Sequence, residues 1–546
     1  MTTTQIICLV VVVVLALLGG FLLVKKSKEH NVCKWIALIA LTIILICSCI
    51  FWTTHFELMS VIIVAYFAIL AGYFIVTKSE SHDLVKWVGL FILVSIALTW
   101  IFTYGNFNGA QYADYGMNQQ GLTDIPNLLY YSINFAGDKI VFLLALGAFY
   151  ALLNRSEGYK KIVTNIASKF KGKEIVFGLS VSLILTIMTA LFSQTFIVLI
   201  FVPFIISILL NMKLDKLAAF AITFGSILIG NMGLLYGGEG LYWFNYYTQT
   251  TIKTAILYRL IVLVIAYILF NLFTVLHAKK VLKDKKLNEK EADPFKIEKF
   301  DKNAKSWPIV TILSILFILM VLGYINWSDS FGITVFAKFH EWLFGLTIGK
   351  FAIFKVLLGT LAKDAAFGAW NLFHGSLVLL LASILVASVS RIKLDDFITA
   401  YGEGFKKISK PLTVFIGAYM VMVAAYMSPY VPTIVNMIFN GITKFNPFLV
   451  SIPAFLSSVF HVDFGFTGYA VASYFTATYT ANVEVIHTIF TTMCGFASFF
   501  VPTSTILLIG LSYLDIKYKT WFKYIWIFLV AMLVILLGLF TILTYI

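Results

Sequence analysis

Apolar runs of about 20 residues, the length that an α-helix needs to cross a bilayer, recur along the whole chain, separated by short polar stretches. The short alternating segments of a transmembrane β-barrel do not occur in the sequence. The pattern therefore predicts an all-α polytopic membrane protein. The first run, residues 5–24, has no basic segment before it, so we interpret it as a transmembrane helix rather than a cleaved signal peptide.

Four spans are predicted first, at residues 5–24, 35–52, 58–77 and 87–105, and one order of elements then appears twice. Each copy has a helix, a hairpin of two short apolar arms, an interrupted helix and a final helix. The first copy covers residues 137–153, 175–212, 217–240 and 255–277, and the second covers 412–427, 447–482, 483–510 and 522–545. Counted along the spans, the copies enter from opposite sides, so we expect inverted repeats.

This order divides the chain into five segments. Residues 1–86 are three extra N-terminal helices, and 87–277 are the first repeat with its preceding helix. Residues 278–306 are a charged linker, 307–390 are connecting helices with an outer segment, and 391–546 are the second repeat.

The net charge of +14 reflects membrane topology rather than a nucleic-acid partner. If residues 25–34 face the cytoplasm, 32 of the 40 Lys and Arg residues fall in inside segments, as the positive-inside rule requires. We therefore expect a multi-pass protein of a bacterial plasma membrane, with the linker 278–306 on the cytoplasmic side. Its partners would be lipid and a small solute.

The polar residues Ser193, Gln194 and Thr195 interrupt an otherwise apolar stretch and divide the first hairpin into its two arms. In inverted-repeat transporters such interruptions lie near the midplane, where free backbone groups bind the solute. Arms of 18 and 17 residues could also be two complete spans joined by a turn at the outer surface. The charge pattern fits both arrangements, so the sequence leaves both open.

Three stretches resemble one known family. "DKIVFLLALGAFYALLNRSEGYKKIV" (138–163) is similar to the opening helix of the four-carbon dicarboxylate and arginine/ornithine carriers, the DcuC/ArcD/YfcC group of the ion transporter superfamily. Residues 190–233 resemble that family's first re-entrant hairpin and broken helix, and 499–524 resemble its second broken helix and its Trp-bearing inner loop. The resemblance covers about residues 87–546 and implies secondary transport of carboxylates or amino acids by a homodimer.

The resemblance also implies where the substrate binds. At the first hairpin tip and the first break, the candidates are Ser193, Gln194, Thr195, Asn231 and Gly233. At the second break they are Ser498, Pro502, Thr503 and Ser504. The second hairpin tip departs from the family pattern, because "HVDFGFTG" (461–468) places His461, Asp463, Gly465 and Thr467 there.

Asp463 is a carboxylate at membrane depth, where a charge is costly unless it is paired or functional. It either lines the solute cavity or has a structural role, paired with His461 or capping the second arm. Glu239 poses the same choice, with a solvated outer rim as the favoured interpretation. If both acids face the cavity, a substrate with an ammonium or guanidinium group beside its carboxylate fits better than a dicarboxylate. His461, Asp463 and Glu239 are then candidates for coupling to H⁺ or Na⁺.

Other classes fit less well. His340 and Glu341 begin like a zinc protease motif, but the second His is missing, and the five cysteines form no CxxC pair. We therefore predict no enzyme, no metal site and no cofactor beyond a coupling ion. A passive channel is disfavoured by the two matched interruptions. Arg259, one turn inside its helix, is expected to extend its guanidinium to the membrane surface.

Overall fold

The computed structural model describes residues 82–284, 303–358, 365–461 and 463–545, together with Gly72 and Asp301. The predicted spans 5–24 and 35–52 lie outside the described residues, as do nearly all of 58–77 and most of the linker 278–306.

Helices form almost all of the described structure, which confirms the predicted fold class. Seven of them are long and apolar enough to cross a membrane: α4 (Asp83–Ile101), α8 (Glu174–Leu191), α13 (Ile256–Lys283), α15 (Trp307–Tyr324), α19 (Leu372–Val389), α20 (Leu394–Met427) and α27 (Tyr518–Thr544). An eighth candidate span combines residues 122–135, which contain α5 (Ile125–Phe135), with α6 (Gly137–Leu153), bent by 70°.

The first copy of the repeated order follows the predicted bounds closely. After α6 and the amphipathic α7 (Glu157–Lys169), α8 forms one arm of the hairpin, and η2 (Thr195–Ile200) with α9 (Val202–Asn211) forms the other. The interrupted helix comprises α10 (Lys216–Phe220), the π-helical η3 (Ala221–Gly225) and α11 (Ser226–Met232). It stops before α12 (Glu239–Thr248), and α13 closes the copy.

The second copy has the same order. Its hairpin consists of α22 (Pro447–Phe460) and a returning arm built from α23 (Phe464–Thr467), the π-helical η4 (Gly468–Ala472), α24 (Ser473–Thr478) and η5 (Thr480–Asn482). The interrupted helix is α25 (Val483–Ala497) followed by α26 (Thr505–Tyr513), and α27 ends the copy. Before the hairpin, α21 (Tyr430–Phe439) occupies part of the interval between the helix predicted at 412–427 and the hairpin predicted at 447–482.

Two boundaries differ from the sequence prediction. The helix expected at 412–427 starts at Leu394, because α20 continues through Pro411 into the basic segment 391–410. Proline lacks one N–H donor but is tolerated in a helix that other helices support, and α6 packs along this one. The second hairpin tip is shorter than 461–468, since α23 already begins at Phe464.

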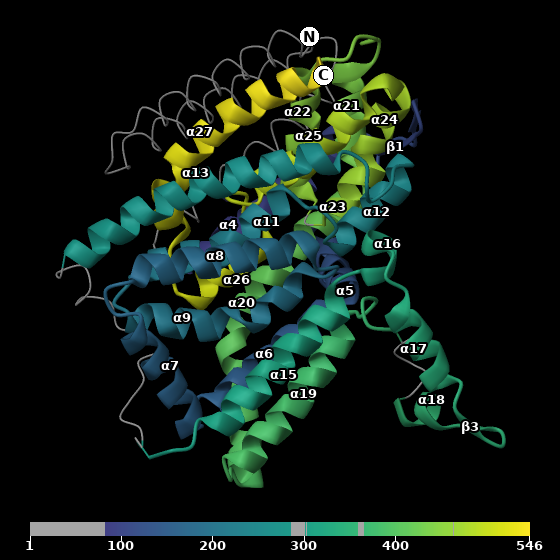
Figure 1. Cartoon of the computed structure of the whole chain (residues 1–546). Coiled ribbons are helices and arrows are strands. Elements are labelled where there is room, and N and C mark those ends of the chain that lie inside the picture. The colour runs from purple at the N-terminus through teal and green to yellow at the C-terminus, as the bar shows by residue number, and fades with distance from the viewer. Residues whose placement is uncertain are drawn as a thin grey trace.

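The helices surround the hairpin tips from two sides. On one side α6 packs on α19 and α20, α20 also packs on α4 and α5, and α15 lies along α19 (Figure 1). On the other side α11 packs on α8 and α25, α25 on α22, and α12 on α23. The hairpin tips and the helix breaks come together between these two groups.

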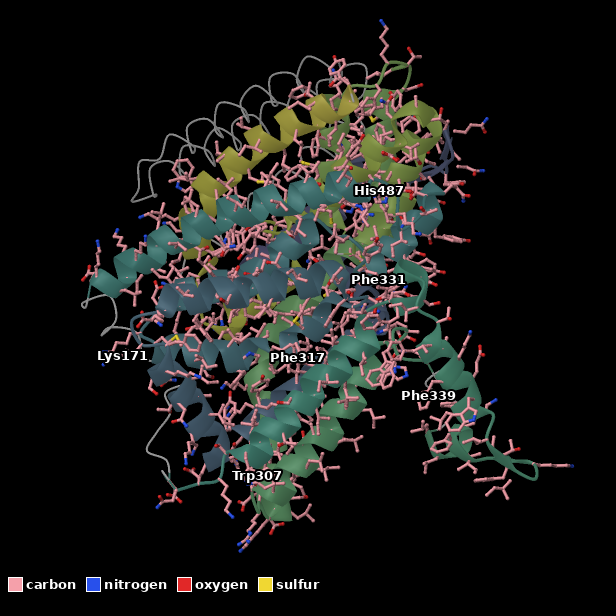
Figure 2. The ribbon with its side chains drawn as sticks, viewed as in Figure 1. Lys171, Trp307, Phe317, Phe331, Phe339 and His487 are labelled. Atoms are coloured by element: carbon pink, nitrogen blue, oxygen red, sulfur yellow. The ribbon has the colours of Figure 1, made fainter. Side chains whose placement is uncertain are left out.

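A peripheral arm projects from the C-terminal end of α15 (Figure 1). It contains α16 (Trp327–Phe331), α17 (Val335–Phe344), the β3 and β4 hairpin (Thr347–Ile348 and Phe351–Ala352) and α18 (Ile353–Leu358). No residue of α17 or α18 is buried, and the side chains of Phe331 and Phe339 are exposed on the arm (Figure 2). Trp307 and Phe317 are exposed on α15 in the same way, as expected of side chains that face lipid.

A smaller hairpin of β1 (Gly105–Asn108) and β2 (Gln111–Asp114), followed by η1 (Leu122–Asp124), precedes α5.

Candidate functional site

The first hairpin tip is enclosed by protein rather than lying at an exposed turn. After α8 ends at Leu191, the backbone N–H of Ser193 donates to the carbonyl oxygen of Tyr324 at 2.8 Å, at the end of α15. The Thr195 hydroxyl lies 3.4 Å from the side-chain oxygen of Asn231 on α11. The tip therefore touches both the end of α15 and the end of the interrupted helix.

The first helix break is held against the first hairpin by backbone bonds. The carbonyl oxygen of Ala190 lies 2.9 Å from the N–H of Gly237, and the carbonyl of Phe192 accepts from Gly238 at 2.8 Å. A Cβ added to Gly237 would lie 2.6 Å from the carbonyl oxygen of Thr189, so glycine permits this close approach. The break, the hairpin tip and the start of α12 are thereby fixed relative to one another.

Arg259 holds the same break from the side of α13, contrary to the sequence expectation. Its side chain is fully buried, and the guanidinium donates to the carbonyl oxygens of Leu234, Ile252 and Thr254. The predicted extension to the membrane surface is therefore wrong. The helix break leaves the carbonyl group of Leu234 without an intrahelical partner. The guanidinium bonds to this carbonyl instead of to water at the membrane surface, because burial strengthens a charge-assisted hydrogen bond.

The second hairpin tip is shaped by Asp463. Its carboxylate accepts the backbone N–H of Gly465 at 2.8 Å and caps α23. His461 is buried and its Nδ1 lies 2.9 Å from the Ser457 hydroxyl on its own helix. Asp463 therefore caps the second arm, which is the structural role considered from the sequence. It also lines the pocket.

The second break is tied to the second hairpin. The Thr503 hydroxyl donates to the carbonyl oxygen of Val459 at 2.7 Å, and the indole N–H of Trp521 donates to the carbonyl oxygen of Phe499 at 2.7 Å. The Ser504 side chain does not cap α26, whose first residues, Thr505 and Ile506, line the cavity. The N-terminal end of α26 is therefore directed toward the same space as the hairpin tips.

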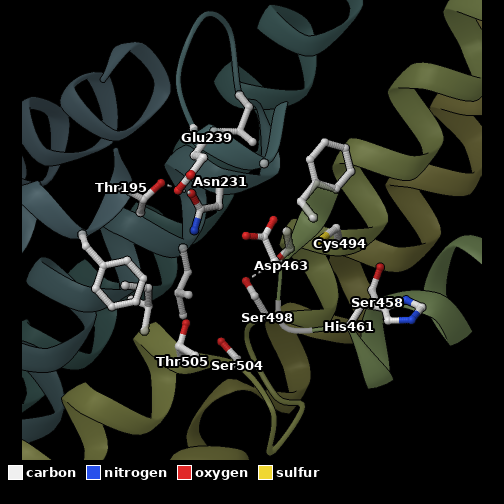
Figure 3. Close-up of a pocket in the computed structure, with 18 of the residues that line it drawn as sticks. Thr195, Asn231, Glu239, Ser458, His461, Asp463, Cys494, Ser498, Ser504 and Thr505 are labelled. Atoms are coloured by element: carbon white, nitrogen blue, oxygen red, sulfur yellow. Dashed lines mark hydrogen bonds between the residues drawn. The ribbon is translucent and has the colours of Figure 1, made fainter. Parts of the chain in front are cut away.

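A pocket of about 140 Å³ lies where these elements meet. This exceeds by far the roughly 10–15 Å³ that one water molecule needs, so the space can hold a small solute. Nine residues predicted from the sequence line it: Gln194, Thr195, Asn231, Glu239, His461, Asp463, Ser498, Thr503 and Ser504. Figure 3 shows Asn231 and Glu239 on one side, Ser504 and Thr505 on the opposite side, and Asp463 and Ser498 between them.

Five predicted residues lie beside the pocket instead of in its lining. Ser193 is bonded through its backbone to Tyr324, and Pro502 is buried within the second break. Gly233 packs on α13, where an added Cβ would lie 2.5 Å from the Cβ of Leu263. Gly465 packs on Trp243, and the Thr467 hydroxyl is buried without a hydrogen-bond partner in the described residues.

The sequence analysis missed Lys139, which lines the pocket from the first turns of α6. Its ammonium lies 3.3 Å from Asp138 and 3.6 Å from Glu239, and the lysine side chain is only 11% exposed. Lys139 falls within the predicted helix 137–153, and a lysine within an apolar helix is itself a signal of a functional site. Tyr419, Cys494 and Thr505 also line the pocket without having been predicted.

The pocket contains charged side chains of both signs in unequal number. Among the lining residues that the structure describes, Lys139 is the one lysine or arginine, and Glu239 and Asp463 are the carboxylates. The side chain of Glu239 lines the pocket and is also half-exposed, so Glu239 lies at the solvent-facing rim of the pocket. Within the described ranges no group of three His, Cys, Asp or Glu side chains could hold a metal ion.

The crystal structure of the Alcanivorax borkumensis YdaH transporter is similar at 11% sequence identity, with a TM-score of 0.40, and covers 84% of this chain and 97% of that one. No curated protein sequence matches the chain significantly. Residues 56–545 match the family described as C4-dicarboxylate anaerobic carrier, DcuC, a range that begins earlier than the resemblance seen in the sequence. The chain therefore belongs to the DcuC family and is a membrane carrier, not an enzyme.

Proposed function

We propose that this carrier moves a small metabolite bearing both a carboxylate and a positively charged nitrogen, with a basic amino acid as the first candidate. The observation that carries the proposal is that Glu239 and Asp463 both line one pocket in which Lys139 is the sole lysine or arginine among the described lining residues. Two carboxylates and one ammonium leave one negative charge, which favours a substrate that carries a cation.

The cationic end of the substrate would lie near Asp463 and Glu239. One carboxylate oxygen of Asp463 accepts a hydrogen bond from the Gly465 backbone N–H at 2.8 Å. A carboxylate has further acceptor sites, which can bind an ammonium or guanidinium group. Because the pocket is enclosed by helices, such a charge-assisted bond is stronger there than in water. An uncharged or purely anionic solute would leave Asp463 without a counter-charge.

The carboxylate end of the substrate would lie across the pocket, against the second break. Ser504 and Thr505 offer hydroxyl groups, and the N-terminal end of α26 contributes the positive end of a helix dipole. Figure 3 supports this polarity, with Glu239 and the serine–threonine pair on opposite sides of the space.

Transport would proceed by alternating access around this pocket. We infer that both hairpins are re-entrant, because their tips line an internal cavity, and that the two copies are inverted repeats, because each contributes one tip and one break. A homodimer in a bacterial plasma membrane, with the linker 278–306 on the cytoplasmic side, completes the proposal.

The second candidate function is transport of a C4-dicarboxylate, which the family description names. Lys139 is the feature that favours it, since an ammonium in the pocket can bind a carboxylate. Two acids in the same pocket would then require protons or Na⁺ to enter with the dianion. Coupling through Asp463, Glu239 or His461 would supply that charge balance.

Uptake into proteoliposomes separates the two. We would reconstitute the purified carrier and measure uptake of labelled arginine, ornithine, a neutral amino acid and succinate, each with an imposed proton or sodium gradient. The amino-acid proposal expects saturable uptake of arginine or ornithine that succinate does not inhibit. Saturable succinate uptake, insensitive to the amino acids, would establish the dicarboxylate function instead. Non-saturating flux of every solute would indicate a channel.

A further inference from the structure

The ion pair between Lys139 and Glu239 joins two elements on different sides of the pocket. Lys139 belongs to α6, whose main packing partners are α19 and α20. Glu239 is the first residue of α12, which packs on α23 at the second hairpin tip. The 3.6 Å contact between the ammonium and the carboxylate therefore connects one group of helices to the other.

The pair also lies where the pocket opens. The side chain of Glu239 is 40% exposed, whereas that of Lys139 is 11% exposed, so the acid meets solvent and the lysine lies beneath it. Both residues line the pocket, so a solute bound there can reach them.

Lys139 has a second acid beside it. Both carboxylate oxygens of Asp138 lie 3.3 Å from its ammonium, in addition to the contact with Glu239. Losing one partner would ordinarily leave a buried charge uncompensated, at a high cost in free energy. Here the contact with Glu239 can break while Asp138 still neutralises the Lys139 ammonium. Glu239 can then pair with a cationic group of the substrate in place of Lys139.

We propose that the Lys139–Glu239 pair is a latch that the cationic group of the substrate opens. In the empty carrier the pair holds α6 and α12 together and opposes the change between outward-open and inward-open states. A bound ammonium or guanidinium takes the place of Lys139 at Glu239, which frees the two sides to move. Flux is then an exchange of one substrate for another, with little movement of the empty carrier. This inference rests on the proposed function and deepens it.

The test compares exchange with net efflux from preloaded proteoliposomes. Labelled arginine is loaded inside, and its efflux is followed with and without unlabelled arginine outside. In the wild type, external arginine should accelerate efflux strongly. In Lys139→Met, efflux into arginine-free medium should rise about fivefold, as expected when a coupling of about 1 kcal/mol is lost. The acceleration by external arginine should fall accordingly.

Two further variants keep the test decisive. Lys139→Arg preserves the cation, so the ratio of net efflux to exchange should stay close to that of the wild type, whatever the absolute rates. Glu239→Asp shortens the acid and opens the 3.6 Å contact without removing the charge, so it should behave like Lys139→Met. Lys160→Met removes a comparable ion pair with Glu157, 2.7 Å long and outside the pocket, and should change neither flux. Exchange and net efflux that keep their wild-type ratio in both Lys139→Met and Glu239→Asp would overturn the latch.

A measurement without transport separates failure of the latch from failure of the proposed function. Cys494 lines the pocket, so in a chain whose other four cysteines are replaced by serine, its rate of maleimide labelling without substrate reports how often the pocket opens. That rate should rise about fivefold in Lys139→Met relative to Lys139→Arg, because it depends on the same coupling. Equal labelling rates in the two variants would contradict the latch. Absence of wild-type transport of every tested solute, by contrast, would count against the proposed function and not against the latch.

Discussion

The guanidinium of Arg259 donates a hydrogen bond to the carbonyl oxygen of Leu234, 25 residues earlier in the chain, and both residues are buried. Leu234 lies in the break between α11 and α12, where the helix leaves carbonyl groups without intrahelical partners. Arg259 also binds the carbonyls of Ile252 and Thr254, which connects the break to the loop before α13. The position of Asn231 and Glu239 at the pocket therefore depends on an arginine that does not line it.

Arg259→Gln should impair both folding and transport. A neutral amide cannot satisfy three carbonyl groups, and an unsatisfied buried polar group costs about 1–3 kcal/mol. We expect a lower thermal unfolding temperature in detergent and at least about tenfold slower uptake, since a displacement of about 1 Å in a binding site has large effects. Arg259→Lys keeps the charge but not the planar donor arrangement, so its unfolding temperature and uptake rate should lie between those of the wild type and Arg259→Gln.

Arg155→Gln is the matched control, because Arg155 pairs with Glu403 at 3.0 Å but is partly exposed. It should change stability by less than about 1 kcal/mol. An Arg259→Gln carrier as stable and as active as Arg155→Gln would show that the guanidinium does not support the break.

Gly233→Ala should destabilise the same break by steric contact. The added Cβ would lie 2.5 Å from the Cβ of Leu263 and 2.9 Å from the carbonyl oxygen of Arg259, both closer than packed atoms approach. Overpacking of this kind typically costs about 1–3 kcal/mol. Gly89→Ala is the control, because nothing lies within 4 Å of its added Cβ. Leu263→Gly removes the Cβ that clashes, so Gly233→Ala should cost less thermal stability in a Leu263→Gly background than in the wild type, and an equal cost in both would argue against the contact.

Much of the fold follows from the sequence because apolar length and its interruption are local properties. The bounds of α6 and α8 were predicted to within a few residues, since each apolar run ends at a polar or glycine-containing stretch. The extension of α20 through Pro411 was not predicted, because a polar, basic segment carries no membrane-span signal even where α6 supports it as a helix.

The candidate site was predictable only in part, for a different reason. Gln194, Asn231 and Ser498 lie at interruptions that the sequence shows, so their convergence follows from the repeated order of elements. Lys139 lies 100 positions from Glu239, and the contact between them exists only because α6 and α12 meet across the pocket. The role of Asp463 as cap and lining residue together likewise required the start of α23.

Asp463→Asn separates the two roles of this side chain. Asparagine is as good an N-cap as aspartate, so the bond from the Gly465 N–H can be kept while the negative charge is lost. We expect an unchanged thermal unfolding temperature and uptake of the cationic substrate slowed at least about tenfold, a loss of about 1.4 kcal/mol or more of binding. Asp463→Ala should lose both the uptake and about 1 kcal/mol of stability. Normal uptake by Asp463→Asn would assign Asp463 to structure alone.

Gln194→Cys tests whether the first hairpin tip lies at membrane depth. Gln194 lines the pocket, so a thiol at this position, in a chain with its native cysteines replaced by serine, should react with maleimide slowly and be protected by arginine. The protection follows because substrate and reagent would compete for one enclosed space. Leu122→Cys in the same background is the control, because Leu122 is 84% exposed and its thiol should react quickly whether or not substrate is present. If the thiol at position 194 reacted as fast as that at 122 and ignored arginine, residues 175–212 would instead be two complete spans joined at the outer surface.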